Sequence, residues 1–205
     1  KYDAYVVTDE VYEHIVYAPY KHIYMQSLEG MRERTIVCNS LSKTYSITGW
    51  RLGYVIANPQ IIDRVKKVHD FLTVGAAAPL MEAAVVGLEF GDGYYDELAA
   101  HYAHMKEVFV GGLKKLGLKY TDPQGAYYVL VDVSEFGVKD DVKFCEWMAQ
   151  FVGVAAVPGS SFFREDVHNL VRFHFAKQDD TLNEAIKRLA TLKEKAMNAK
   201  NVDWR

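Results

Sequence analysis

The sequence predicts an α/β protein in two parts, and two observations carry this prediction. Short apolar runs between residues 4 and 57, rich in β-branched and aromatic side chains and bounded by polar turns, have the length and composition of strands. Longer stretches whose apolar residues recur three and four positions apart have the period of helices. The 205-residue chain is 50% hydrophobic and 25% charged, which is ordinary for a globular protein.

The first part contains three predicted strands and one predicted helix. The strands are expected at residues 4–12, 35–40 and 50–57. The first is expected to be buried, and it runs into the acidic residues Asp9 and Glu10. Asn58 and Pro59 end the third strand, and an amphipathic helix is expected over residues 61–72.

Gly75 and Pro79 are expected to break the chain before the segment LMEAAVVGLEF, and the pattern of elements changes after Gly117. Beyond them the pattern predicts, in order, a helix at 94–116, a strand at 126–133, a helix at 140–151, strands at 154–157 and 171–176, and a terminal helix at 180–197. We therefore expect residues 1–75 to belong to one domain, residues 76–95 to link the domains, and residues 96–205 to form a smaller α+β domain.

Charge and hydropathy exclude several classes of protein. The formal net charge is −3 and no basic patch with interleaved aromatic residues is present, which argues against a nucleic-acid partner. No apolar run approaches the roughly 20 residues of a membrane-spanning helix. The first residues do not have the pattern of a signal peptide. These features predict a cytoplasmic protein without a membrane partner.

Metal or disulfide chemistry is not predicted. The two cysteines, Cys38 and Cys145, have no zinc-type or redox-type spacing and are expected to be buried, reduced thiols. His101 and His104 are three apart on a predicted helix, but no third ligand follows at a recognisable spacing. They are expected to be surface histidines.

The segment SLSKTYSITGWRLG, residues 40–53, concentrates polar chemistry in a short loop. Lys43 taken alone could be a solvated loop lysine. A lysine becomes a covalent catalyst when it condenses with an aldehyde cofactor, whose phosphate then needs an anchor. The hydroxyls of Ser40 and Ser42 and the forked guanidinium of Arg51 have the chemistry of such an anchor. A nucleotide-binding P-loop would need a glycine spacing that is absent here.

Residues 40–53 resemble the lysine-site signature of class I aminotransferases, the pyridoxal-phosphate enzymes of fold type I. The resemblance implies that Lys43 is the Schiff-base lysine and that Ser40, Ser42 and Arg51 bind the phosphate of pyridoxal 5'-phosphate. It also implies the fold class: an α/β chain that forms the end of a large-domain mixed sheet followed by a smaller α+β domain.

The segment TDEVY, residues 8–12, is similar to a second motif of the family. By this resemblance Asp9 keeps the pyridine nitrogen protonated, and a protonated ring withdraws electrons from the substrate Cα. Tyr12 would hydrogen-bond the phenolic oxygen of the ring. The alternative for Asp9 is a helix N-cap.

The segment VRFHFA, residues 171–176, is a third point of resemblance. Alternation with period two puts Arg172 and His174 on one face of a strand and Phe173 and Phe175 on the other, buried face. In the family an arginine in this strand binds the substrate α-carboxylate, which implies that role for Arg172. A surface arginine is the alternative. DPQGAYYVL and VPGSSFF also look like turns of the family's small domain.

The chain departs from the family pattern in two ways. Family subunits are much longer and begin with a large-domain half that this sequence lacks, so we expect a fragment, one piece of a split protein or an incomplete record. The dicarboxylate-specific branch uses an arginine that is absent between Leu72 and Met81. The substrate pair therefore stays open.

The expected function is transamination between an amino acid and a 2-oxo acid, catalysed through pyridoxal phosphate by a homodimer when full length. Two alternatives remain at this level. A lyase or synthase of the same fold would share the cofactor residues, and an aminotransferase-like domain also serves as the ligand-sensing half of some transcription regulators. An upstream winged-helix segment would favour the regulator.

Overall fold

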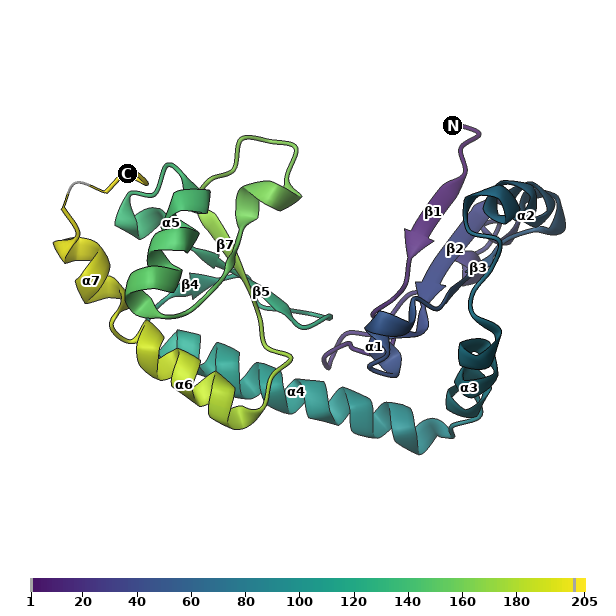
Figure 1. Cartoon of the computed structure of the whole chain (residues 1–205), viewed down its shortest axis with the longest axis horizontal. Coiled ribbons are helices and arrows are strands. Elements are labelled where there is room, and N and C mark those ends of the chain that lie inside the picture. Colours follow the sequence, from purple (N-terminus) through teal and green to yellow (C-terminus); the bar gives the residue numbers. More distant parts are fainter. Residues whose placement is uncertain (1, 201) are drawn as a thin grey trace. The chain divides into compact units, whose positions relative to one another are not determined.

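The computed structural model describes residues 2–200 and 202–205 and divides into two compact units, Lys1–Ala99 and Ala100–Arg205 (Figure 1). The boundary falls inside the long helix α4 (Asp92–Lys115). The expected domain limits at residues 75 and 96 stay a prediction. Among the described residues, no helix combines the length and the apolar character needed to cross a membrane.

The first unit is built on a three-stranded mixed sheet in the order β1-β2-β3, which Figure 1 draws in purple and blue. The strands are β1 (Val6–Asp9), β2 (Thr35–Ser40) and β3 (Gly53–Ile56). The helices are α1 (Leu41–Thr44), α2 (Pro59–Leu72) and α3 (Ala78–Leu88), with 3-10 turns at Met25–Ser27, Arg32–Arg34 and Thr48–Trp50. β2 runs parallel to β1 and antiparallel to β3.

The middle strand β2 has the predicted bounds, whereas its neighbours differ from expectation. β1 is shorter than residues 4–12 and is not buried, since the Val7 side chain is 67% exposed. The reason is its place at the edge of the sheet, where only β2 pairs with it among the described strands. β3 is likewise exposed along its length.

A proline in the first turn marks where two helices begin, and one of them also has a side-chain cap. The side chain of Asn58 accepts a hydrogen bond from Ile61 N at 3.0 Å, and Pro59 occupies the first turn of α2, where its missing N–H costs nothing. Pro79, expected to break the chain, also lies in the first turn of a helix, α3. The break predicted before residue 80 therefore falls slightly upstream, between Leu72 and Ala78, because a proline fits the first turn of a helix.

The second unit contains a four-stranded antiparallel sheet in the order β4-β5-β7-β6. Its strands are β4 (Lys119–Tyr120), β5 (Tyr128–Asp132), β6 (Val157–Pro158) and β7 (Leu170–His174). Its helices, besides α4, are α5 (Asp141–Trp147), α6 (Asp179–Leu189) and α7 (Leu192–Asn198), with a π-helical turn at Met148–Val152 and 3-10 turns at Ser134–Phe136 and Gly159–Phe162.

Two expectations for this unit are corrected, and one short strand was not predicted. The strand predicted at 154–157 is reduced to Val157–Pro158, and the predicted terminal helix is two helices that break at residues 190–191. The two-residue strand β4 was missed because so short a run carries no period. Cys145 is buried as expected, whereas Cys38 in the first unit is only half-buried because its strand lies in the open sheet there. His101 and His104 are exposed, as expected.

The core of the second unit lies between the sheet and its helices. Val171 and Phe173 of β7 are buried while Arg172 between them is half-buried, which confirms the predicted alternation. The Phe173 ring lies 5.8 Å from the ring of Phe109 on α4. Each fully buried side chain of this size contributes about 1.5 to 3 kcal/mol. This packing fixes which face of β7 carries Arg172.

A side chain at Gly53 would collide with the main chain of the neighbouring strand. A Cβ there would lie 2.7 Å from the main-chain oxygen of Asn39 on the paired strand. We predict that Gly53→Ala lowers the free energy of unfolding by about 1 to 3 kcal/mol, because backbone has to move to admit the methyl group. Urea denaturation measures the effect.

Gly49→Ala is the matched control, since a Cβ at Gly49 would meet nothing within 4 Å. A loss of stability as large for Gly49→Ala as for Gly53→Ala would contradict the close approach of β2 and β3.

Candidate active site

The predicted residues of the first unit lie where the strands β1 and β2 end. These strands are parallel and Asp9 pairs with Cys38, so the segments that follow the two strands leave the sheet at the same edge. Glu10 N donates to Cys38 O at 2.9 Å and extends the pairing by one step. The carboxyl end of β1 carries Asp9, and Ser40 ends β2 two residues after Cys38. Parallel strand ends of this kind are common places for binding sites.

A buried polar link joins the segment after β1 to the end of β2. Asn39 Nδ2 donates to Glu13 Oε1 at 2.6 Å, and Ser40 N donates to Asn39 Oδ1 at 2.7 Å. Asn39 is buried, which reduces the competition of water for these hydrogen bonds. Tyr12 lies in the turn that this link holds. Glu13 and Asn39 were not predicted as site residues, although each is adjacent in sequence to one of the motifs.

The loop after β2 is organised by its hydroxyl groups. Ser40 caps α1, since Ser42 N donates to Ser40 Oγ at 3.1 Å, and the two serine oxygens lie 2.6 Å apart. Thr48 Oγ1 donates to Ser42 O at 3.2 Å and lies 3.5 Å from Lys43 Nζ. Thr48, to which the sequence analysis gave no role, therefore connects the lysine to the serine turn.

Arg51 closes the same loop in a strained conformation. Ser46 and Arg51 both have φ of 57°, in the left-handed region that non-glycine residues seldom adopt. Arg51 Nη1 donates to Thr48 O at 2.8 Å, and the rest of the guanidinium is exposed. No carboxylate of the described residues pairs with it. The loop thus offers a lysine amine, hydroxyls and an uncompensated guanidinium, which suits an anion.

Arg172 belongs to the second unit. Its guanidinium carbon lies 3.7 Å from the centre of the Phe162 ring and 4.2 Å from that of Tyr128. It also lines a cavity of about 690 Å³ together with Val157, His174 and residues of α6. Burial, followed by the charges of Lys177 and Arg172, lowers the pKa of His174. Neither Phe162 nor Tyr128 was predicted from sequence.

A buried carboxylate lies behind the Phe162 turn. Asp141, which is fully buried, accepts hydrogen bonds from Ser160 N at 2.7 Å and Ser160 Oγ at 2.8 Å. His168 Nδ1 lies 3.2 Å from Asp141 Oδ1, and His168 Nε2 lies 2.7 Å from Asp166 Oδ1. Burial opposes the charge of Asp141, but these hydrogen bonds outweigh it and lower its pKa. Hydrogen bonds to Asp141 and Asp166 raise the pKa of His168.

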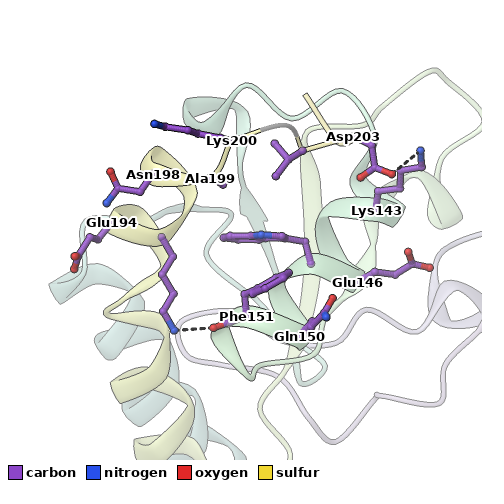
Figure 2. A pocket seen from close by; sticks show the side chains of 12 residues that line it. Lys143, Glu146, Gln150, Phe151, Glu194, Asn198, Ala199, Lys200 and Asp203 are labelled. Atoms are coloured by element: carbon purple, nitrogen blue, oxygen red, sulfur yellow. Dashed lines mark hydrogen bonds and ion pairs between the residues drawn. The ribbon is translucent and has the colours of Figure 1, made fainter.

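A further cavity of about 760 Å³ lies in the second unit beside α5 and α7 (Figure 2). Trp147 and Phe151 form its apolar side, and Lys195 Nζ donates to Phe151 O at 2.6 Å across it. Lys143 and Asp203 pair at 3.0 Å on its rim. It contains none of the predicted site residues.

Comparison with known proteins assigns the family. Residues 1–189 match the model of the family "Aminotransferase class I and II". The chain belongs to this family, and its structural neighbours are aminotransferases of fold type I.

Relatives and solved structures agree with this assignment. The chain is 36% identical over 192 residues to the methionine aminotransferase of Escherichia coli and 35% identical over 200 residues to a probable N-succinyldiaminopimelate aminotransferase of Mycobacterium tuberculosis; each alignment covers 93% of this chain and 50% of the relative. The structure of the N-succinyldiaminopimelate aminotransferase from Mycobacterium tuberculosis superposes with a TM-score of 0.86 at 35% identity, covering 92% of this chain and 50% of that one. The chain thus spans about half the length of the curated relatives it matches.

The His168 ion pairs predict a pH dependence of stability. A histidine whose pKa is raised by folding contributes stability that is fully present below its unfolded pKa, about 6.5, and is lost as the pH rises through its folded pKa. We therefore expect the free energy of unfolding to fall as the pH rises above about 6.5, and His168→Gln to remove that part of the slope. Denaturant titrations between pH 5 and 9 test this, and equal slopes in both proteins would contradict the raised pKa.

Proposed function

We propose that the protein containing this chain is a pyridoxal-phosphate-dependent transaminase that moves an amino group between an amino acid and a 2-oxo acid. The observation that carries the proposal is the loop of residues 40–53, where a lysine amine, two hydroxyls and an uncompensated guanidinium surround one turn. Membership of the aminotransferase family supports it. The identity of the amino acid is left open, because the relatives are named for different substrates.

The donor set fits a phosphate ester. Arg51 would bind phosphate oxygens with its fork, and the paired hydroxyls of Ser40 and Ser42 would donate to the same group. Lys43, on the single turn between Ser42 and Arg51, would hold the cofactor covalently.

The end of β1 supplies the groups for the cofactor ring. The bound pyridoxal phosphate supplies an electron-withdrawing ring that makes the substrate Cα proton acidic. Asp9 would keep a proton on the ring nitrogen by its negative charge, and Tyr12 would donate a hydrogen bond to the phenolic oxygen. The side chain of Asp9 also accepts from Val11 N at 3.2 Å, a turn contact that orients the carboxylate.

Lys43 and Arg172 would act on the substrate itself. Lys43 Nζ would take the proton from the substrate Cα as a general base and then, as a general acid, deliver it to C4′, the aldehyde carbon of the cofactor. Thr48 Oγ1, 3.5 Å from Nζ, would orient the amine. The guanidinium of Arg172 would bind the substrate α-carboxylate in a bidentate fork. A homodimer of intact subunits in the cytoplasm completes the proposal, by analogy with the family.

The attachment to Lys43 is tested by borohydride trapping. The polypeptide at its encoded length is incubated with pyridoxal phosphate, reduced, digested and mapped by mass spectrometry. We expect the added mass on Lys43, with Lys43→Arg unlabelled and Lys21→Arg, which changes an exposed lysine elsewhere in the unit, labelled as in the wild type. Label on another lysine, or no label, would refute the proposal.

The role of Arg172 is tested by Arg172→Lys, which keeps the charge and loses the fork. A charged hydrogen bond contributes about 1.5 to 3 kcal/mol, so we expect kcat/KM for amino acids to fall by about one to two powers of ten. Cofactor affinity should stay unchanged, and simple amines, which have no carboxylate, should react no worse than with the wild type. Equal losses for amines and amino acids, with a lower Tm, would instead make Arg172 a structural residue.

A further inference from the structure

The guanidinium of Arg172 is held between two aromatic rings. Tyr128 pairs with His174, and Leu130 with Arg172, so Tyr128 and Arg172 are diagonal neighbours on one face of adjacent strands. Phe162 reaches the guanidinium from outside the sheet, at 3.7 Å from ring centre to guanidinium carbon. Two ring faces restrict the plane of the guanidinium and leave its edge, which carries the N–H donors, for an anion.

No described carboxylate competes for that edge. The described residues place two rings, but no acidic side chain, against the Arg172 guanidinium. An arginine of this kind keeps its charge and its donors for a ligand. Its orientation therefore depends on how firmly the two rings are held, and Tyr128 is held by the central strand β5.

Phe162 is not on a strand, so its position needs another support. It ends the 3-10 turn Gly159–Phe162, and its side chain is 45% exposed. Ser160, two residues earlier, gives both its N–H and its hydroxyl to Asp141. His168, at the far end of the same loop, contacts Asp141 as well. One buried carboxylate on the first turn of α5 therefore anchors both ends of the loop that carries Phe162.

The energetics favour a positioning role for this carboxylate. A fully buried ionised group is tolerated only when hydrogen bonds satisfy it, and charge-assisted bonds are about twice as strong as neutral ones. A second constraint acts at the neighbouring position, where a Cβ on Gly159 would lie 2.5 Å from Leu170 O. The turn is thus fixed to α5 by the hydrogen bonds of Asp141. It is fixed to β7 by the close approach of Gly159 to Leu170 O.

We infer that Asp141 is a positioning residue for substrate binding: by anchoring the Ser160 turn it holds the Phe162 ring on Arg172, whose fork is then presented to a carboxylate. The inference rests on the proposed function only for the identity of the anion. The positioning of the Arg172 guanidinium by Phe162, and of Phe162 by Asp141, concerns the second unit alone. It can be measured without an assay of catalysis.

The test follows the reactivity of Arg172 toward phenylglyoxal, a dicarbonyl reagent for guanidinium groups, by site-resolved mass spectrometry of the polypeptide at its encoded length. We expect Asp141→Asn and Phe162→Leu each to raise the rate of modification at Arg172 by about three- to tenfold, because the ring that covers the guanidinium is displaced or removed. Arg188, a partly exposed arginine of the same unit, is the internal reference and should not change. Phe162→Tyr, which keeps a ring, should restore the wild-type rate.

Two matched controls separate positioning from general loosening. Phe163→Leu changes the adjacent exposed phenylalanine, and Asp203→Asn removes an exposed carboxylate that pairs with Lys143 on α5. Neither should alter the rate at Arg172. If Asp141→Asn fails to fold, Phe162→Leu still tests whether the Phe162 ring covers Arg172. Ser160→Ala, which removes only the hydrogen bond of the hydroxyl, should give a smaller increase in the rate of modification at Arg172.

Unchanged modification of Arg172 in Asp141→Asn, Ser160→Ala and Phe162→Leu would overturn the inference, and so would an equal rise at Arg188. The outcome is distinguishable from failure of the proposed function. A rise in the modification rate at Arg172 alone supports the positioning role of Asp141. This holds even if Arg172→Lys leaves kcat/KM for amino acids unchanged, because that second result would refute only the carboxylate-binding role of Arg172. In the intact enzyme, Phe162→Leu should raise KM for amino acids with little change in kcat and leave simple amines unaffected.

Discussion

The pairing of β2 with both of its neighbours is the constraint on which the first unit depends. Its parallel register with β1 sets Asp9 beside Cys38, and its antiparallel register with β3 sets Ser40 beside Gly53. The first pairing brings the TDEVY turn to the edge where the lysine loop begins, and the second closes that loop into a turn that carries Lys43 and Arg51. A slip of either register by one residue would reverse every side chain of the slipped strand.

In the second unit the main feature is the orientation of one cationic side chain, that of Arg172. Antiparallel pairing gives β7 a buried face, formed by Val171 and Phe173, and a face on which Arg172 is free of carboxylate partners among the described residues. Aromatic rings then restrict the guanidinium without neutralising it. A carboxylate partner would also have oriented Arg172, but it would have occupied the donors that a substrate needs.

The elements that could be predicted from the sequence are those with a regular spacing of apolar residues or a recognisable motif. β2 has its predicted bounds, and Arg172 alternates with buried neighbours as expected, because hydrophobic period reports which side of a strand is covered. The exposure of Val7 was missed because the same apolar run suits a central or an edge strand. The contacts of Thr48, Asn39 and Asp141 were missed because they join residues through space, and no spacing in a single sequence records such partners.

The central claim is that the ends of β1 and β2 form one cofactor site. A crystal structure of the polypeptide at its encoded length, grown with pyridoxal phosphate, tests it most directly. The account predicts density continuous with Lys43 Nζ, a phosphate within hydrogen-bonding distance of Ser40, Ser42 and Arg51, and the ring nitrogen beside Asp9. Cofactor density joined to another lysine, or a phosphate bound away from Arg51, would contradict the account.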